Sequence, residues 1–110
     1  MKENTLFPPK TELRPTIYAY QDKNPNYKGL LKIGYTTLEV EKRVSQQYPI
    51  LQPYGKPYEI VFNETAMYDD GSIFKDYEIH KYLKKKRIEN PDGEWFKCSV
   101  EELRAAYLAI

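Results

Sequence analysis

Two short segments rich in β-forming residues constrain the fold of this chain more than any other feature. They cover residues 15–20 and residues 30–36. The nine residues between them are mostly Asp, Asn, Pro, Lys and Gly, which favour a turn-rich loop. A short loop joins neighbouring strands most economically when the strands pair antiparallel. The pattern therefore predicts an antiparallel hairpin near the start of the chain.

A helix is predicted directly after the second segment. Thr36 and Glu39 have the spacing of a capping box, in which side chains bind the free backbone N–H groups of a helix start. Val40 and Val44 would form the apolar edge of this helix. Pro49 would end it after residue 48, because proline cannot continue a helix.

The middle of the chain predicts one more strand and a second helix. Residues 58–68 are rich in β formers and follow a proline-rich loop at residues 49–57. An Asp-Asp-Gly-Ser turn at residues 69–72 then precedes a helix that we predict over residues 73–86.

The end of the chain predicts a short extended piece and a third helix. A turn at residues 90–93 leads into the extended piece at residues 94–98. Ser99 and Glu102 form a second capping box, and the helix after them continues to the final residue without a stop signal. We therefore expect this domain to be a module of a longer protein.

Length and charge limit the functions that the chain can have. Its 110 residues suffice for one compact domain, which we place at residues 15–110 after a lead-in at residues 1–14. The chain has 11 Tyr against 4 Phe and 1 Trp, and we interpret most of the tyrosines as strand residues. The net charge of +1 provides no overall field that would attract nucleic acid.

A nucleic-acid contact must therefore come from a local basic cluster. The best candidate is the end of the second predicted helix, and a solvated helix end is the alternative interpretation. The cluster consists of Lys81, Lys84, Lys85, Lys86 and Arg87.

The single cysteine, Cys98, excludes an internal disulfide and a multi-cysteine zinc site. A reducing compartment fits this composition, so we expect a cytoplasmic protein. Residues 1–13 lack the apolar core of a signal peptide, and no apolar run is long enough to span a membrane.

Asp76 requires an explanation, because helical angles place it among inward-facing residues. At 100° per residue it falls in a stripe with His80, while Glu78 points away. An inward carboxylate must be paired, hydrogen-bonded or bound to a cation. It could be a ligand for Mg²⁺ (or Mn²⁺), an ion-pair partner of Arg43, or a hydrogen-bond partner of His80. The other members of the stripe are Ile73, Tyr77 and Leu83.

Two further side chains are candidates for catalysis. His80 is the only histidine and stands four residues after Asp76, so the two can interact, although a packed and hydrogen-bonded histidine is the plainer interpretation. Arg43 lies beside Val44 on the first predicted helix. It could bind a phosphate with its forked guanidinium, or it could form a surface salt bridge with Glu39.

Two of these motifs together resemble those of the GIY-YIG nuclease superfamily. Thr16-Ile17-Tyr18 stands where the first motif of that superfamily would be, and Lys32-Ile33-Gly34 stands where the second would be. Within that superfamily, the chain resembles the T5orf172-type branch, and this resemblance extends over residues 15–110. It lies in Lys32-Ile33-Gly34-Tyr35-Thr36 followed by Arg43, in Asp76-x-x-x-His80, and in Gly93-Glu94-Trp95-Phe96.

The resemblance implies a fold and a chemistry. It implies an α+β fold with a small three-stranded antiparallel sheet flanked by about three helices. It also implies cleavage of DNA phosphodiesters with one divalent metal ion. Tyr18 would act on the attacking water, Arg43 would stabilise the phosphate, and Asp76, where Glu is more common, would hold the metal. Glu94 is a further carboxylate without an assigned role.

The chain departs from the motifs at two positions. Thr16 replaces Gly in the first motif, and Lys32 replaces Tyr in the second. Lys32 could be a cation beside the phosphate, or it could lower the pKa of Tyr18. Tyr20 and Tyr35 are spare tyrosines. Alternation along a strand places Tyr20 on the face of Tyr18 and Tyr35 on the face opposite Lys32.

The leading hypothesis is thus a metal-dependent DNA endonuclease domain of a larger protein that carries helicase or restriction-type domains. The alternative is a nucleic-acid-binding or targeting module that has lost cleavage. A third interpretation is a protein-interaction domain with a tyrosine-rich face.

Overall fold

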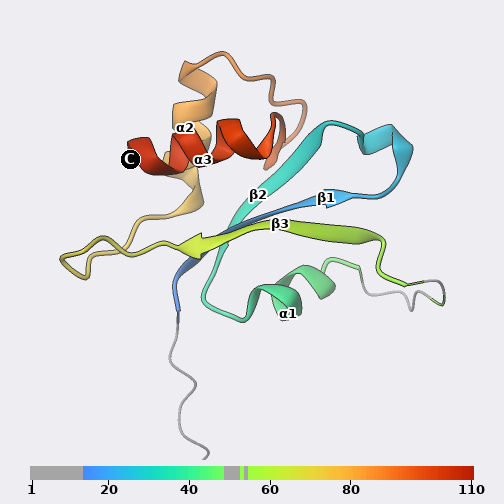
Figure 1. Cartoon of the computed structure of the whole chain (residues 1–110), viewed down its shortest axis with the longest axis horizontal. Helices are drawn as coiled ribbons and strands as arrows, with labels where there is room; N and C mark the ends of the chain where they lie inside the picture. The colour runs from blue at the N-terminus through green and yellow to red at the C-terminus, as the bar shows by residue number, and fades with distance from the viewer. Residues whose placement is uncertain (1–13, 49–52, 54) are drawn as a thin grey trace, which may run out of the picture.

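The computed structural model describes residues 14–48, residue 53 and residues 55–110. The predicted lead-in, apart from Arg14, and most of residues 49–54 lie outside the described residues. The helices and strands are shown in Figure 1. In chain order they are β1 (Thr16–Asp22), the 3₁₀ turn η1 (Pro25–Tyr27), β2 (Leu30–Thr36), α1 (Val40–Ser45), β3 (Tyr58–Thr65), α2 (Asp76–Lys85), β4 (Trp95–Lys97) and α3 (Val100–Ala109).

The strands form one antiparallel sheet in the order β3-β1-β2-β4. The predicted hairpin of β1 and β2 is confirmed, with Tyr18 opposite Gly34 and Tyr20 opposite Lys32. The α+β class is confirmed as well. The expected three strands become four, because the extended piece before α3 pairs with the outer edge of β2 from Leu30 to Lys32. This pairing provides hydrogen-bond partners for backbone N–H and C=O groups that an edge strand would leave unpaired.

Alternation along β1 sends its side chains into two separate cores. Tyr18 and Tyr20 pack with Val40 and Val44 of α1, on the side that we call the α1 face. Ile17 and Ala19 pack on the opposite side, against the inner residues of α2 and α3. The strands accordingly lie between α1 and the pair α2 and α3 (Figure 1). The predicted common face of Tyr18 and Tyr20 is confirmed.

The first helix is shorter than the sequence predicts. It begins at Val40, and Glu39 precedes it without a side-chain cap. The predicted capping box of Thr36 is wrong, because Thr36 belongs to β2 and its hydroxyl accepts a hydrogen bond from the Leu38 N–H instead. The capping box at Ser99 and Glu102 is confirmed.

The second helix also begins later than predicted, at Asp76 instead of residue 73. Ile73 forms a β-bridge with Met67, which holds the residues before the helix in a hairpin. The predicted inward stripe is wrong at Ile73 and Tyr77, whose exposed fractions are 50% and 59%. The helix instead buries Ile79 together with Leu83. In the described part of the chain, no helix has the length and apolar character that crossing a bilayer requires.

Gly34 is required by a close approach between the two central strands. A Cβ atom at this position would lie 2.6 Å from Cζ and Oη of Tyr18, closer than real Cβ atoms come to other heavy atoms. The ring of Tyr18 thus lies across the backbone of β2 at the place where a side chain is missing.

Gly34→Ala is therefore expected to displace the Tyr18 ring and to reduce the free energy of unfolding by about 1–3 kcal/mol. Urea denaturation of the purified domain measures this loss. The same substitution in a Tyr18→Ala background should cost clearly less, because the clash is gone. An equal loss in both backgrounds would show that the close approach of Tyr18 does not constrain residue 34.

Candidate functional site

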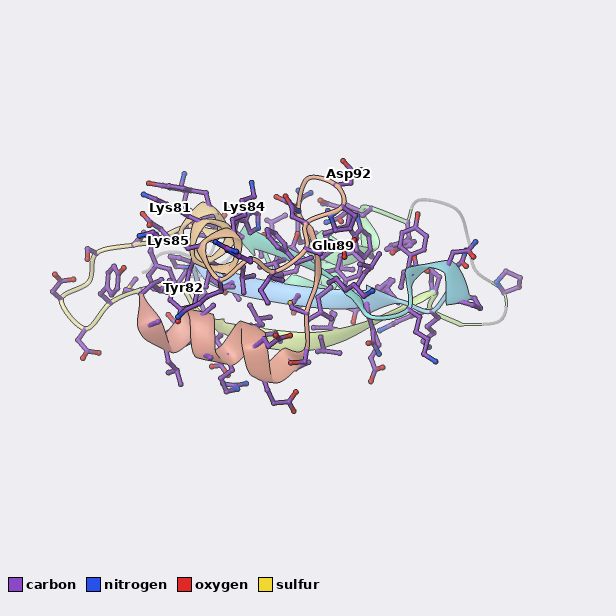
Figure 2. The ribbon with its side chains drawn as sticks, turned by 90° about the horizontal axis from the view of Figure 1, so that it is seen from above. Lys81, Tyr82, Lys84, Lys85, Glu89 and Asp92 are labelled. Carbon is purple, nitrogen blue, oxygen red and sulfur yellow. The ribbon has the colours of Figure 1, made fainter. Side chains whose placement is uncertain are left out.

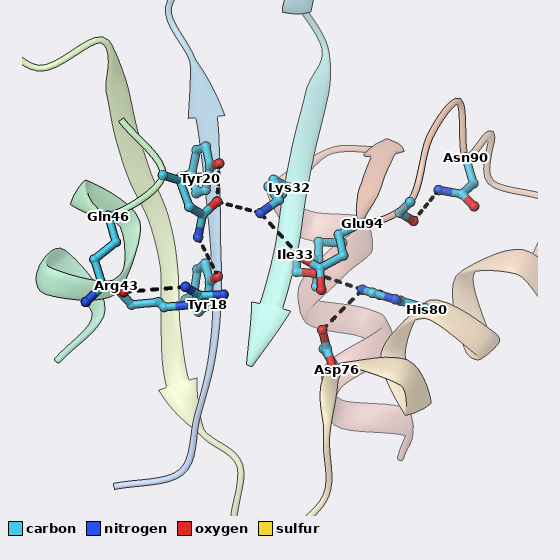
Figure 3. Close-up of polar contacts among 12 residues, drawn as sticks. Tyr18, Tyr20, Lys32, Ile33, Arg43, Gln46, Asp76, His80, Asn90 and Glu94 are labelled. Atoms are coloured by element: carbon cyan, nitrogen blue, oxygen red, sulfur yellow. Dashed lines mark hydrogen bonds and ion pairs between the residues drawn. The ribbon is translucent and has the colours of Figure 1, made fainter. Parts of the chain in front are cut away.

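A row of polar side chains extends from α1 across β1 and β2 to the first turn of α2 (Figure 3). Each member is in contact with the next. The Arg43 guanidinium is a neighbour of the Tyr18 hydroxyl, which accepts a hydrogen bond from the side chain of Gln47. Gln47 accepts a hydrogen bond from Lys32, which pairs with Glu94, which in turn contacts Asp76. We call these six residues the polar row: Arg43, Tyr18, Gln47, Lys32, Glu94 and Asp76.

Gln47 connects three of the predicted site residues. Its Nε2 donates to the Tyr18 hydroxyl at 3.1 Å, and its Oε1 accepts from the Tyr20 hydroxyl at 2.7 Å and from the Lys32 amino group. Gln47 was not among the site residues predicted from the sequence. Its only signal there is the spacing of four residues from Arg43, which places two residues on the same side of a helix.

Burial dominates the titration of the two buried tyrosines in β1. It raises the pKa of Tyr18 above its ordinary value of 10.0, while Gln47 and Arg43 act in the opposite direction. Burial likewise raises the pKa of Tyr20 to about 12. A lowered pKa of Tyr18, one of the two roles suggested for Lys32, is not found, and the Lys32 amino group binds Gln47 and Glu94 instead. Tyr18 is therefore a neutral phenol near pH 7.

Glu94 completes the row at the outer edge of β2. Its backbone C=O accepts from the Ile33 N–H at 2.9 Å, and its carboxylate lies 3.4 Å from the Lys32 amino group. Asn90 holds the preceding turn by donating to the carbonyl oxygens of Gly93 and Trp95. Burial and the contact with Asp76 raise the pKa of Glu94, whereas Lys32 lowers it. The sequence identified this carboxylate but gave it no role.

Asp76 is the first residue of α2, where the positive end of the helix dipole stabilises a carboxylate. Its Oδ2 lies 3.9 Å from Nε2 of His80, and 18% of its side chain is exposed. The inward position predicted for the Asp76 side chain is thus found, although the helical stripe that predicted it is partly wrong. Its contacts are with His80 and Glu94, so the alternative ion pair with Arg43 is not formed.

His80 fits the packed, hydrogen-bonded interpretation. Its Nε2 lies 2.8 Å from the backbone oxygen of Ile33, and its ring packs at 4.9 Å on that of Phe96. Since a carbonyl oxygen can only accept, Nε2 must carry a proton. His80 therefore ties the start of α2 to β2 beside Asp76.

The remaining predicted site residues lie away from the polar row. Tyr35 is on the opposite face of β2, as alternation predicts, under the amino group of Lys75. Lys84, Lys85, Lys86 and Arg87 are exposed at the far end of α2. By the helical rise, the first of them is roughly 12 Å from Asp76. Figure 2 shows Lys81, Lys84 and Lys85 directed outward from this helix.

Asp76 and Glu94 form the part of the row suited to a metal ion. Carboxylate oxygens are the ligands that Mg²⁺ prefers, and one or two of them commonly suffice because the ion keeps several waters. Within the described residues, no three His, Cys, Asp or Glu side chains gather in a way that could hold a metal ion. The donor set therefore fits a hydrated Mg²⁺ or Mn²⁺ ion and not a fully protein-ligated metal.

The sequence places this chain in a known family. The profile of the T5orf172 domain matches residues 16–110, so the chain belongs to the T5orf172 domain family. It is also similar to the N-terminus of a proposed type II restriction enzyme and methyltransferase of Mycoplasma pneumoniae. The two are 28% identical over 112 residues, which cover 86% of this chain and 67% of that protein. No solved structure gives a significant match.

The buried tyrosines predict a loss of stability at high pH. The pKa of Tyr20 is 10.0 in the unfolded chain and about 12 in the fold, so its contribution is complete below pH 10 and is lost as the pH rises through 12. Tyr20→Phe should reduce this pH-dependent loss by about 2–3 kcal/mol. Urea denaturation between pH 8 and about pH 12 measures the change. Tyr68→Phe, at an exposed position, is the control, and equal pH dependence in both variants would contradict the prediction.

Proposed function

We propose that this domain is a GIY-YIG-like endonuclease module that hydrolyses DNA phosphodiester bonds with the help of a divalent metal ion. The observation that carries the proposal is the polar row. It brings two cations, a tyrosine hydroxyl and two carboxylates to one place, from α1, β1, β2, α2 and the turn before β4. Membership of the T5orf172 family and the name of the Mycoplasma relative support it.

In this mechanism Arg43 and Lys32 bind the non-bridging oxygens of the scissile phosphate and stabilise the charge of the transition state. Tyr18 orients the attacking water, a role that a neutral phenol can fill. Asp76 and Glu94 would hold Mg²⁺ or Mn²⁺, whose positive charge stabilises the leaving oxygen when the ion is bound. His80 would keep the start of α2 in position.

The proposal extends to the setting in which the domain acts. A restriction-type protein in the cytoplasm, with further DNA-processing domains in the same chain or in an associated one, would bring this module to DNA. The name of the Mycoplasma relative, which combines a restriction enzyme with a methyltransferase, supports that arrangement.

Asp76→Ala should reduce metal-dependent nicking of a supercoiled plasmid by about 100-fold or more, because the developing charge loses its counter-ion. Nicking by the wild-type domain is measured with Mg²⁺, with Mn²⁺ and with EDTA. Glu78→Ala is the matched control, since it removes a carboxylate from the same turn of α2 outside the polar row. Wild-type nicking that survives in Asp76→Ala would refute the metal assignment.

A second candidate function is a DNA-binding or targeting module without cleavage. Burial of the site favours this candidate, because Tyr18 is only 1% exposed and its hydroxyl already accepts a hydrogen bond from Gln47. This candidate expects salt-sensitive DNA binding and no nicking under any metal condition. The plasmid assay therefore separates the two functions.

Both candidates expect the basic end of α2 to bind DNA phosphates. Replacing Lys84, Lys85, Lys86 and Arg87 by Gln should weaken binding to all sequences alike. The slope of log affinity against log salt should also fall by roughly 0.9 for each phosphate that is no longer neutralised. Fluorescence anisotropy at several salt concentrations measures both effects. Lys23→Gln with Lys28→Gln, in the exposed loop between β1 and β2, is the control. A slope unchanged from the wild type would place the DNA-binding surface elsewhere.

A further inference from the structure

Gln47 holds a fixed place in the fold although it lies beyond the last residue of α1. Its backbone N–H donates to the Val44 C=O at 2.9 Å. The next residue, Tyr48, is tied down twice, by its backbone N–H on the Ser45 C=O at 3.0 Å and by its hydroxyl on Asp22 at 2.7 Å. These hydrogen bonds fix the backbone at Gln47, so its side chain reaches the polar row from a defined position.

The chemistry of its neighbours determines which way the Gln47 amide faces. A lysine ammonium group has donors only, so the oxygen of the amide must face Lys32. The NH₂ group must then face Tyr18, at 3.1 Å from its hydroxyl oxygen. This orientation follows from the hydrogen-bonding partners alone.

The fixed amide in turn determines the role of the Tyr18 hydroxyl. The oxygen accepts a hydrogen bond from Gln47, and the neighbouring Arg43 guanidinium is also a donor only. Since neither of these groups can accept a hydrogen bond, the phenol must direct its own proton elsewhere. In the described residues, no side chain or backbone oxygen accepts that proton through a hydrogen bond from Tyr18.

We propose that Gln47 is a positioning residue, whose amide turns the Tyr18 hydroxyl so that its proton is offered to the water or phosphate oxygen bound beside Arg43. Through its oxygen, the same amide keeps Lys32 and Tyr20 beside Tyr18. The inference rests on the proposed endonuclease function, but the geometry of the three side chains can be tested without cleavage.

Two substitutions distinguish the role of the amide oxygen of Gln47 from that of its NH₂ group. Gln47→Glu keeps an acceptor for Lys32 and Tyr20 but offers no donor to Tyr18 when ionised. Gln47→Met keeps the length of the side chain and removes both. Gln21→Met is the matched control, because Gln21 is an exposed glutamine of β1 that binds Glu59, away from the row. Thermal melting shows which variants remain folded.

Cleavage kinetics provide the first readout. Both Gln47 variants should lower kcat by roughly 10-fold, the effect of one hydrogen bond that acts at the reacting centre, with a much smaller change in KM. Gln21→Met should match the wild type. The proposal fails if folded Gln47→Glu retains full kcat, or if its only effect is on KM.

The second readout is the titration of Tyr18 by nuclear magnetic resonance of ¹³C-labelled tyrosine, with the signal assigned by Tyr18→Phe. The charged and titratable groups that face Tyr18 are Arg43, Glu94 and Tyr20. Because the Gln47 donor lowers the pKa of Tyr18, its loss in Gln47→Glu and Gln47→Met should raise that pKa further. An unchanged titration in both variants would overturn the positioning role, even if the wild-type domain did not cleave DNA. An absence of wild-type cleavage with a shifted titration would instead reject only the proposed function.

Discussion

The close approach of Tyr18 to Gly34 is the interaction on which the rest of the site depends. Because residue 34 lacks a side chain, the ring of Tyr18 can lie across β2 and bring its hydroxyl toward Lys32 and the residues beyond. The antiparallel register places the two residues directly opposite one another, so a shift by one residue would move Tyr18 to the other face of the sheet. One missing Cβ atom and one register thus determine where the polar row can form.

The row remains compatible with a stable core because its buried oxygen and nitrogen atoms have partners, although the Tyr18 proton has none among the described residues. An unpaired hydroxyl or amide in such a place would cost roughly 1–3 kcal/mol. Here the Gln47 side chain binds Tyr18, Tyr20 and Lys32, and the Lys32 charge is balanced by Glu94. The exception to this balance is the contact between Asp76 and Glu94, where two carboxylates meet. A cation would relieve this like-charge contact, which supports our proposal of a metal ion at this end of the row.

The sequence predicted those features that depend on local periodicity. Alternation correctly assigned Tyr18 and Tyr20 to one face and Tyr35 to the other, because the side-chain period of a strand leaves no other choice. The inward position of Asp76 was predicted from a helix assumed to begin at Ile73. Ile73 instead belongs to a hairpin, and the helix begins at Asp76 itself. Gln47 and Glu94 could not be given roles from the sequence. Their positions depend on a turn and on a strand pairing between segments far apart in the chain.

The short length of β4 explains why these distant segments meet. β4 pairs with β2 only from Leu30 to Lys32, so it leaves the outer edge of β2 beyond Ile33 without a strand. The Ile33 N–H and C=O are then satisfied by the Glu94 backbone and by His80, which fixes the Glu94 turn and α2 at the same point. A longer β4 would extend the sheet into the space that Asp76 occupies. The place where sheet pairing stops is therefore also the place where the two carboxylates can reach the strand that carries Lys32 and Gly34.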